Sequence, residues 1–208
     1  MATPLLSSMW ISRLRPPHVG GLLLGVAVLL TSVPCAAQGA PPEDQIAGAL
    51  LPAPEALRAG ATVLGYDAVG ALVTLREGTN DLICLADLPG DDRFHAACYH
   101  AALEPYMARG RELKAQGVDA QESFRIRHAE ADAGTLPMPS EPAAVYNVAL
   151  SLETFDPATA TVTLYAVYMP YATQSSTGLP ERPGPPGTPW IMRPGTASAH
   201  IMLVPPRQ

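Results

Sequence analysis

An acidic turn followed by a histidine contains the side chains of this sequence that are best suited to chemistry. Asp87 and Asp91 flank a Leu-Pro-Gly turn, and His95 follows a few residues later. Carboxylate oxygens and imidazole nitrogens bind divalent cations and exchange protons near neutral pH. The segment therefore predicts either a metal site or a group that activates water for hydrolysis. The competing interpretation is that the aspartates cap a helix and are solvated.

A second candidate site involves Trp190, His200 and Tyr171, which flank a proline-rich stretch at 172–189. Polyproline-like segments are stiff and can cover a cleft. In that case the three side chains would line a site for a small molecule, a peptide or an envelope component. Alternatively, Trp190 caps the core and His200 is an ordinary strand residue.

A third feature is the run of Arg109, Arg111 and Lys114 within one predicted helix. Such a run can bind an anion. More often it is the solvated face of a helix, with cations near the C-terminal end.

Two cysteines, Cys84 and Cys98, remain after the leader described next. An even pair in an exported protein predicts a disulfide, which would stabilise the fold by roughly 3 kcal/mol through loop closure. The alternative is that Cys98 binds a metal ion together with His95 and His100.

The first 37 residues have the three parts of a cleavable secretory leader. Arg13 and Arg15 provide a positive start, residues 20–33 carry no charge, and Cys35-Ala36-Ala37 offers small residues for a signal peptidase. The apolar stretch of roughly 14 residues is short of the ~20 that span a bilayer. We therefore predict cleavage near Ala37 and a secreted or periplasmic protein without a stable membrane span, rather than an uncleaved anchor.

Composition limits the partners. The chain has 13 basic and 19 acidic residues, so its formal charge of −6 becomes −8 once Arg13 and Arg15 are removed. This acidity disfavours nucleic acid and anionic membrane surfaces, which require clustered Lys and Arg. About 170 residues after the leader suit one domain with its own core.

Short apolar runs separated by turn residues predict the strands. The first three, at 61–66, 71–76 and 82–86, are spaced as a β-meander. The runs at 145–152 and 161–169 alternate and predict an antiparallel hairpin, and 190–192 with 199–204 predict a last pair. Helices are expected at 42–51, at 93–103 with Asp91 or Asp92 as its N-cap, at 106–116, and from the capping box Asp119–Glu122 to Gly134.

The order of strands, helices and strands predicts an α+β fold, with a mainly antiparallel sheet and two or three helices packed on one face. The expected organisation is a leader at 1–37, an Ala/Pro-rich lead-in at 38–60 and a single domain at 61–208. The sequence contains no nucleophile elbow, P-loop or zinc-protease motif, so no catalytic residue and no cofactor are predicted.

A set of short motifs resembles a group of exported bacterial proteins. The motifs are L-R-x-G-T-N at 75–80, the two cysteines with D-x-P-G at 87–90 between them, P-W-I-M at 189–192, P-G-T at 194–196 and A-H-I-M at 199–202. The similarity extends over residues 60–205. It implies an exported bacterial protein and, because the group has no assigned activity, it implies no catalytic residue.

Two functional hypotheses follow. The first is an exported, non-catalytic binding or interaction domain. The second is a metal- or water-dependent hydrolase that uses Asp87, Asp91 and His95, with His200 close to them. The second hypothesis requires these side chains to converge in the fold.

Overall fold

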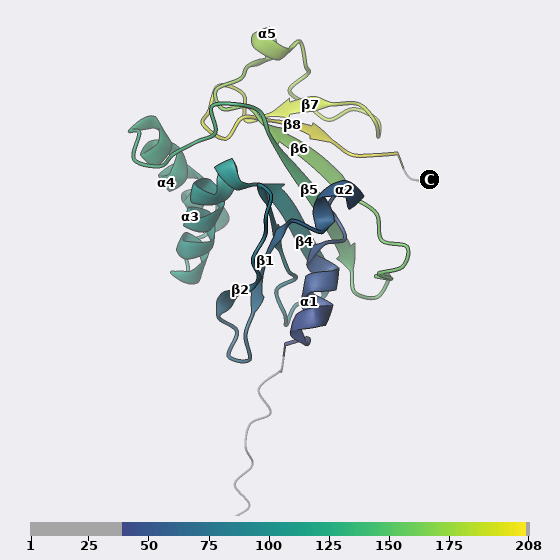
Figure 1. Ribbon diagram of the computed structural model, residues 1–208. Coiled ribbons are helices and arrows are strands. Elements are labelled where there is room, and N and C mark those ends of the chain that lie inside the picture. Colours follow the sequence, from purple (N-terminus) through teal and green to yellow (C-terminus); the bar gives the residue numbers. More distant parts are fainter. Residues whose placement is uncertain (1–38, 207–208) are drawn as a thin grey trace, which may run out of the picture. The chain divides into compact units, whose positions relative to one another are not determined.

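The computed structural model describes residues 39–206 (Figure 1). The predicted leader, with Cys35 and the cleavage point near Ala37, lies outside the described residues. Within residues 39–206, no helix combines the length and apolar character needed to cross a membrane.

One eight-stranded sheet forms the centre of the described region, in the order β2-β1-β3-β4-β5-β6-β8-β7. Neighbouring strands are antiparallel except β1 and β3, which are parallel. The predicted α+β class with a mainly antiparallel sheet is confirmed. The strands are β1 (Thr62–Tyr66), β2 (Leu72–Arg76), β3 (Leu82–Leu85), β4 (Arg93–His100), β5 (Ala143–Ser151), β6 (Leu164–Tyr168), β7 (Trp190–Met192) and β8 (His200–Leu203).

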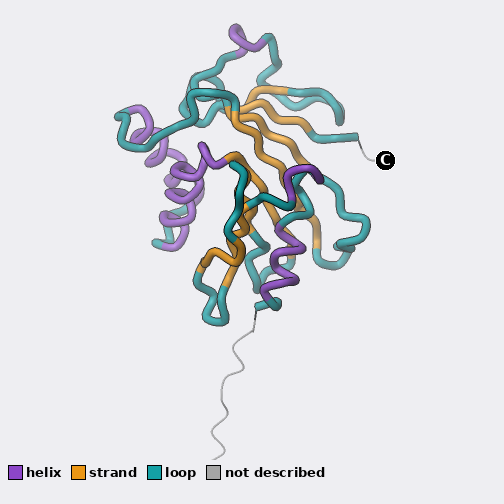
Figure 2. Tube along the Cα trace, in the orientation of Figure 1, coloured by secondary structure: helices purple, strands orange, loops and turns teal. Residues whose placement is uncertain are grey.

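Within residues 39–206, five α-helices and a short 3-10 helix accompany the sheet. They are α1 (Pro42–Ala49), α2 (Glu55–Arg58), η1 (Ala101–Leu103), α3 (Glu104–Ala115), α4 (Ala120–Asp132) and α5 (Gln174–Thr177). The side chain of Asp119 caps α4 by accepting from the backbone N–H groups of Gln121 and Glu122, as its position in the sequence predicts. Figure 2 shows that residues 172–189 are loop apart from the single turn of α5.

The first three predicted strands are present, but they do not form a meander. Strand β3 pairs with β1 in parallel, on the side of β1 that is away from β2. The β2–β3 connection therefore crosses the start of β1, where the N–H groups of Thr79 and Asn80 donate to the carbonyl of Gly60 at 2.7 and 3.0 Å. A Cβ on Gly78 would collide with the backbone nitrogen of Thr62, so this crossing requires glycine.

The predicted helix at 93–103 is wrong, because residues 93–100 form strand β4. The run Phe94, Ala97, Cys98 fits a helical period, but Phe94, Ala96 and Cys98 fit a strand period equally well. Strand β4 pairs with β3 on one side and β5 on the other, and these two ladders decide the conformation. Asp91 caps no helix; its Oδ1 accepts from the N–H of Arg93 at 2.9 Å.

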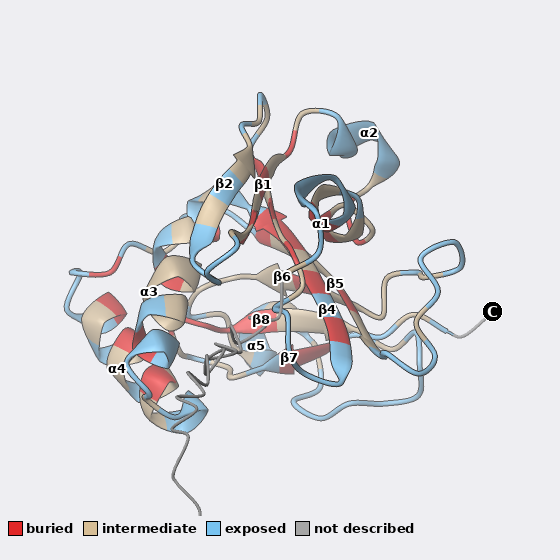
Figure 3. Ribbon diagram, turned by 90° about the horizontal axis from the view of Figure 1, so that it is seen from below, coloured by how far each residue is buried: buried red, intermediate tan, exposed pale blue. Residues whose placement is uncertain are grey.

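Helices lie on both faces of the sheet. On one face, Ala49 and Ala53 pack against Val63, Cys84 and Cys98. On the other face, which carries α3 and α4 as expected, η1 and α3 pack against Tyr99, Val145 and Ala166. Consecutive residues of a strand point to opposite faces, so Cys98 faces the α1 layer and Tyr99 faces the α3 layer. Figure 3 shows the buried residues following β4 and β5 between them.

Helix α1 belongs to the packed domain, although the sequence places it in a lead-in. Gln45 is buried, and its amide donates to the carbonyl of Tyr66 at 2.9 Å and accepts from the N–H of Tyr66 at 2.8 Å. Ala49, the last residue of α1, is fully buried. The packed structure therefore begins well before residue 61.

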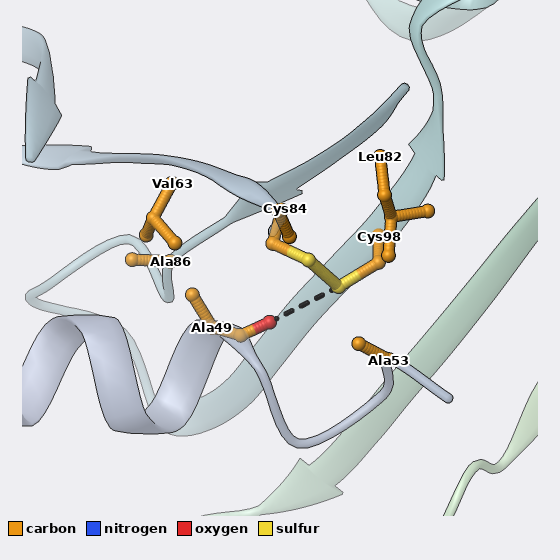
Figure 4. Close-up of a cluster of buried hydrophobic side chains, with 8 residues drawn as sticks. Ala49, Ala53, Val63, Leu82, Cys84, Ala86 and Cys98 are labelled. Atoms are coloured by element: carbon orange, nitrogen blue, oxygen red, sulfur yellow. Dashed lines mark hydrogen bonds between the residues drawn. A yellow bond between two sulfur atoms is a disulfide. The ribbon is translucent and has the colours of Figure 1, made fainter. Parts of the chain in front are cut away.

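Cys84 and Cys98 form the predicted disulfide (Figure 4). The two residues lie directly opposite each other in the β3–β4 ladder, and both are fully buried. Sγ of Cys98 lies 3.2 Å from the carbonyl oxygen of Ala49. Because a disulfide sulfur carries no hydrogen, this is a close packing contact. The bonded sulfurs are not free to bind a metal ion with His95 and His100.

Candidate functional site

A hollow of about 410 Å³ lies between α1, the β3–β4 turn, the start of β4 and the β5–β6 loop. We call it the Asp87 pocket. Its apolar walls come from four separate stretches of the chain and consist mainly of Ala47, Gly48, Leu51, Pro89, Phe94, Phe155 and Pro157. Asp44, Gln45 and Asp87 supply its side-chain polar groups.

Two stacked phenylalanines form one wall of the pocket. The rings of Phe94 and Phe155 lie 3.8 Å apart between centroids and are tilted by only 12°. Phe94 points to the α1 face because it has the same strand parity as the buried residues Ala96 and Cys98. The β5–β6 loop folds back to bring Phe155 onto it, and Leu51 completes this cluster.

Asp87 is the most distinctive polar group of the pocket. Its Oδ1 accepts from the backbone N–H of His95 at 2.7 Å, which holds the carboxylate across the β3–β4 turn. Burial raises the pKa of Asp87 above its ordinary value, the N–H of His95 partly opposes that rise, and the charge of Asp91 adds to it. A carboxylate with a raised pKa in an apolar pocket is a typical feature of a functional site.

The other polar groups divide into one structural and one available side chain. The Gln45 amide is committed to Ala40 and Tyr66 and holds α1 against β1. Asp44 is exposed on α1 and borders the pocket. The pocket therefore offers two carboxylates, Asp44 and Asp87, beside apolar walls. This combination suits a ligand with an apolar body and a positively charged end.

The predicted metal residues Asp87, Asp91 and His95 are neighbours, but their side chains have different roles. Asp87 lines the pocket, Asp91 holds the N–H of Arg93, and His95 contacts Asp87 through its backbone N–H. In the described part of the chain, no three His, Cys, Asp or Glu side chains gather in a group that could hold a metal ion.

His200 does not lie near Asp87, Asp91 and His95, the other side chains of the hydrolase hypothesis. His200 pairs with Tyr168, which pairs with Ala143 at the first residue of β5. His95 pairs with Ala149, near the far end of the same strand. His200 and His95 therefore lie near opposite ends along the strand direction, and the strands β5 and β6 separate them across the sheet.

The structure places Trp190, His200 and Tyr171 away from the pocket. Trp190 and His200 are buried, and the His200 ring stacks on Tyr168 with 4.8 Å between centroids. Tyr171 is half exposed, and its hydroxyl donates to Asp132 at 3.0 Å. The proline-rich loop is attached to the sheet by bonds from Ile191 N–H to Pro180 and from Gly187 N–H to Val204.

Sequence reasoning found Asp87 but not the rest of the pocket. Phe155 stands beside the Asp156-Pro157 turn, and the sequence reads there as a plain hairpin loop. Asp44 lies in the segment assigned to the lead-in. The sequence feature that points to the pocket wall is the pair Phe94 and Phe155, two of only three phenylalanines in the chain.

Taken together, the sheet, the disulfide and the pocket define an α+β domain with a largely apolar pocket. Comparison of the chain with protein-family models, with curated proteins and with solved structures finds no match.

Proposed function

We propose that this protein is an extracytoplasmic binding domain, and that its Asp87 pocket takes a small ligand with an apolar body and an amine or other cationic end. The observation that carries the proposal is the carboxylate of Asp87 in the wall of an apolar hollow of about 410 Å³. An apolar wall binds the ligand body by burying it from water, and a partly buried carboxylate attracts a cation more strongly than a solvated one.

Two observations support a location beyond the cytoplasm. A buried disulfide such as Cys84–Cys98 persists in an oxidising compartment and is rare in the cytosol. The N-terminal residues 1–37 have the composition of a secretory leader.

The ligand proposal is tested with phenethylamine, which combines a phenyl ring with a cationic amine. We expect phenethylamine to shift the backbone NMR signals of α1 and of the β5–β6 loop. Asp87→Asn should weaken its binding about tenfold, which corresponds to about 1.4 kcal/mol for one charged hydrogen bond. Binding should also weaken as the pH falls through the raised pKa of Asp87, because the protonated carboxyl no longer attracts the amine.

Matched controls separate the pocket from the general acidity of the chain. Glu43→Gln removes one exposed carboxylate from the same helix without touching the pocket and should leave the affinity unchanged. Ala47→Leu places a larger side chain into the hollow from an exposed position and should abolish binding. Equal binding of phenethylamine and 3-phenylpropionate, or no response to Asp87→Asn, would reject the proposal.

A further inference from the structure

A second hollow, of about 520 Å³, lies between α3 and α4 and has the opposite charge to the Asp87 pocket. We call it the Arg127 hollow. The charged side chains that line it are Arg111 and Lys114 from α3 and Arg127 from α4, and none of its lining residues is acidic. Met107, Val118 and Phe124 supply apolar surface, and Ser123 supplies a hydroxyl.

Arg127 is a buried cation that forms no ion pair with a carboxylate of the described residues. The charge of Glu130 attracts it, but the Glu130 carboxylate is hydrogen-bonded to Arg109. The residue is 8% exposed, and its guanidinium donates to the carbonyls of Tyr106 and Ser123 at 3.2 and 3.3 Å. It also lies over the Tyr106 ring, 4.2 Å from the centroid. Neutral partners of this kind do not balance the charge, and a buried charge without a counter-ion is costly. The hollow beside it is where a counter-ion could bind.

Within residues 39–206, only one of the three cations that line the hollow has an ion-pair partner. Arg111 is balanced by Glu104, with Nη2 2.5 Å from Oε1. Among the described residues, neither Arg127 nor Lys114 forms an ion pair with a carboxylate. Two positive charges without an ion-pair partner therefore line the hollow, in a protein whose formal net charge is −6.

A neighbouring cation strengthens this local field. The guanidinium of Arg193 lies over the ring of Phe124, 3.2 Å from the centroid, and Phe124 lines the hollow. The charge of Arg193 contributes to the lowered pKa values of Arg127 and His128, although burial is the larger cause for both. Cations from α3, α4 and the segment after β7 thus meet at one place.

A glycine in α3 makes room for the buried guanidinium. Gly110 lies in the interior of the helix, where glycine costs up to about 1 kcal/mol relative to alanine. A Cβ at this position would lie 2.7 Å from Nη1 of Arg127. Both features, a glycine inside a helix and a buried unpaired arginine, reduce stability. Their combination has a ready explanation if Arg127 serves to bind a ligand.

We propose that the Arg127 hollow is a binding site for a phosphate monoester, with Arg127 and Lys114 contacting the phosphate and the apolar wall contacting the organic group. A phosphate monoester carries close to two negative charges at neutral pH, which matches the two cations without an ion-pair partner. Arginine contacts phosphate with paired N–H donors, and lysine contacts it as a point charge. This site is independent of the Asp87 pocket.

The test uses phenyl phosphate, with binding measured by calorimetry and by NMR shifts of α3 and α4. Lys114→Gln and Gly110→Ala should each weaken binding about tenfold, the first by removing a charge and the second by displacing the guanidinium. Arg125→Gln is the matched control, since Arg125 lies on α4, is paired with Glu122 and points to solvent. It should leave the affinity unchanged.

The stability of Arg127→Met provides a readout that a purely structural arginine would not give. The two carbonyls that accept from Arg127 lie inside helices and keep their backbone hydrogen bonds, so this variant should fold with a melting temperature close to wild type or above it. Phenyl phosphate should raise the melting temperature of wild type but not of this variant. Absence of binding at millimolar phenyl phosphate, or equal loss in Lys114→Gln and Arg125→Gln, would overturn the proposal.

Discussion

His128 and His200 are histidines that the fold partly or largely shields from water. His128 Nε2 lies 2.5 Å from the buried Ser198 hydroxyl, and His200 Nδ1 lies 2.7 Å from the Ser198 carbonyl. Burial lowers the pKa of both imidazoles, and the charge of Arg193 lowers both further. The neutral form is therefore the one that the folded state favours.

Stability should consequently fall on mild acidification. A histidine whose folded pKa lies below its unfolded value of about 6.5 makes its full contribution to stability above that pH and loses it as the pH drops toward the lowered pKa. We expect the free energy of unfolding, measured with urea, to decrease from pH 7.5 to pH 5.5. His128→Gln, which keeps a polar partner for Ser198, should flatten this decrease. Parallel curves for variant and wild type would show that His128 is not the titrating group.

At the same scale, Asp87 shows that a sequence can point to a reactive side chain without revealing what surrounds it. The sequence places a carboxylate beside a turn and suggests chemistry. Its pKa is raised by burial, and the pocket that it lines is completed by Phe94 and α1, which belong to other segments.

At the scale of elements, the crossing of the β2–β3 connection over the start of β1 leaves no room for a side chain. A side chain at Gly78 would meet backbone atoms of Thr62 and Gly60. These atoms cannot move without disturbing the pairing of Thr62 with Ile83 and the bonds from Thr79 and Asn80 to Gly60. A flexible side chain could yield, but backbone atoms in a ladder cannot.

Gly78→Ala should therefore destabilise the protein by more than ~2 kcal/mol in urea unfolding. Gly70→Ala is the matched control, because Gly70 has a φ of +81° but no atom near its missing Cβ. Only the backbone conformation opposes that substitution, and we expect a loss of about 1 kcal/mol. Equal losses in the two variants would mean that the crossing tolerates a side chain.

Strand β4 shows where local patterns fail. Its apolar residues are compatible with both helix and strand periods, and its alanines favour a helix. The ladders to β3 and β5 and the bond from Cys98 to Cys84 outweigh that preference. By contrast, α4 is correctly predicted because Asp119 and Gly134 define its ends through local interactions.

At the scale of the whole molecule, the two hollows carry opposite charge and lie on opposite faces of the sheet. The Asp87 pocket, with its two carboxylates, lies on the α1 face. The Arg127 hollow lies between α3 and α4, which cover the other face. A net charge of −6 describes neither site, because each site is set by a few side chains in a partly dry environment.

The proposed export also concerns the whole chain. We predict that the protein purified from its native host begins at Gln38 and that, after denaturation without reductant, Cys84 and Cys98 resist alkylation. Intact-mass spectrometry checks both points in one measurement. An intact Met1 together with two alkylated cysteines would contradict the proposed location.

By itself, the sequence determined the features that depend on near neighbours or on simple counts. These are the α3 and α4 segments, the β5–β6 and β7–β8 pairs, and the pairing of Cys84 with Cys98. Turn residues, caps and alternation act over a few residues, and two cysteines allow only one partner each.

Only the tertiary structure decided the parallel pairing of β1 with β3, the strand at 93–100, the place of α1 in the core and both hollows. Each of these depends on contacts between residues far apart in the chain, such as Gln45 with Tyr66 and Arg127 with Tyr106. Such contacts form only when distant segments are packed together, and no local pattern in the sequence specifies which segments will meet.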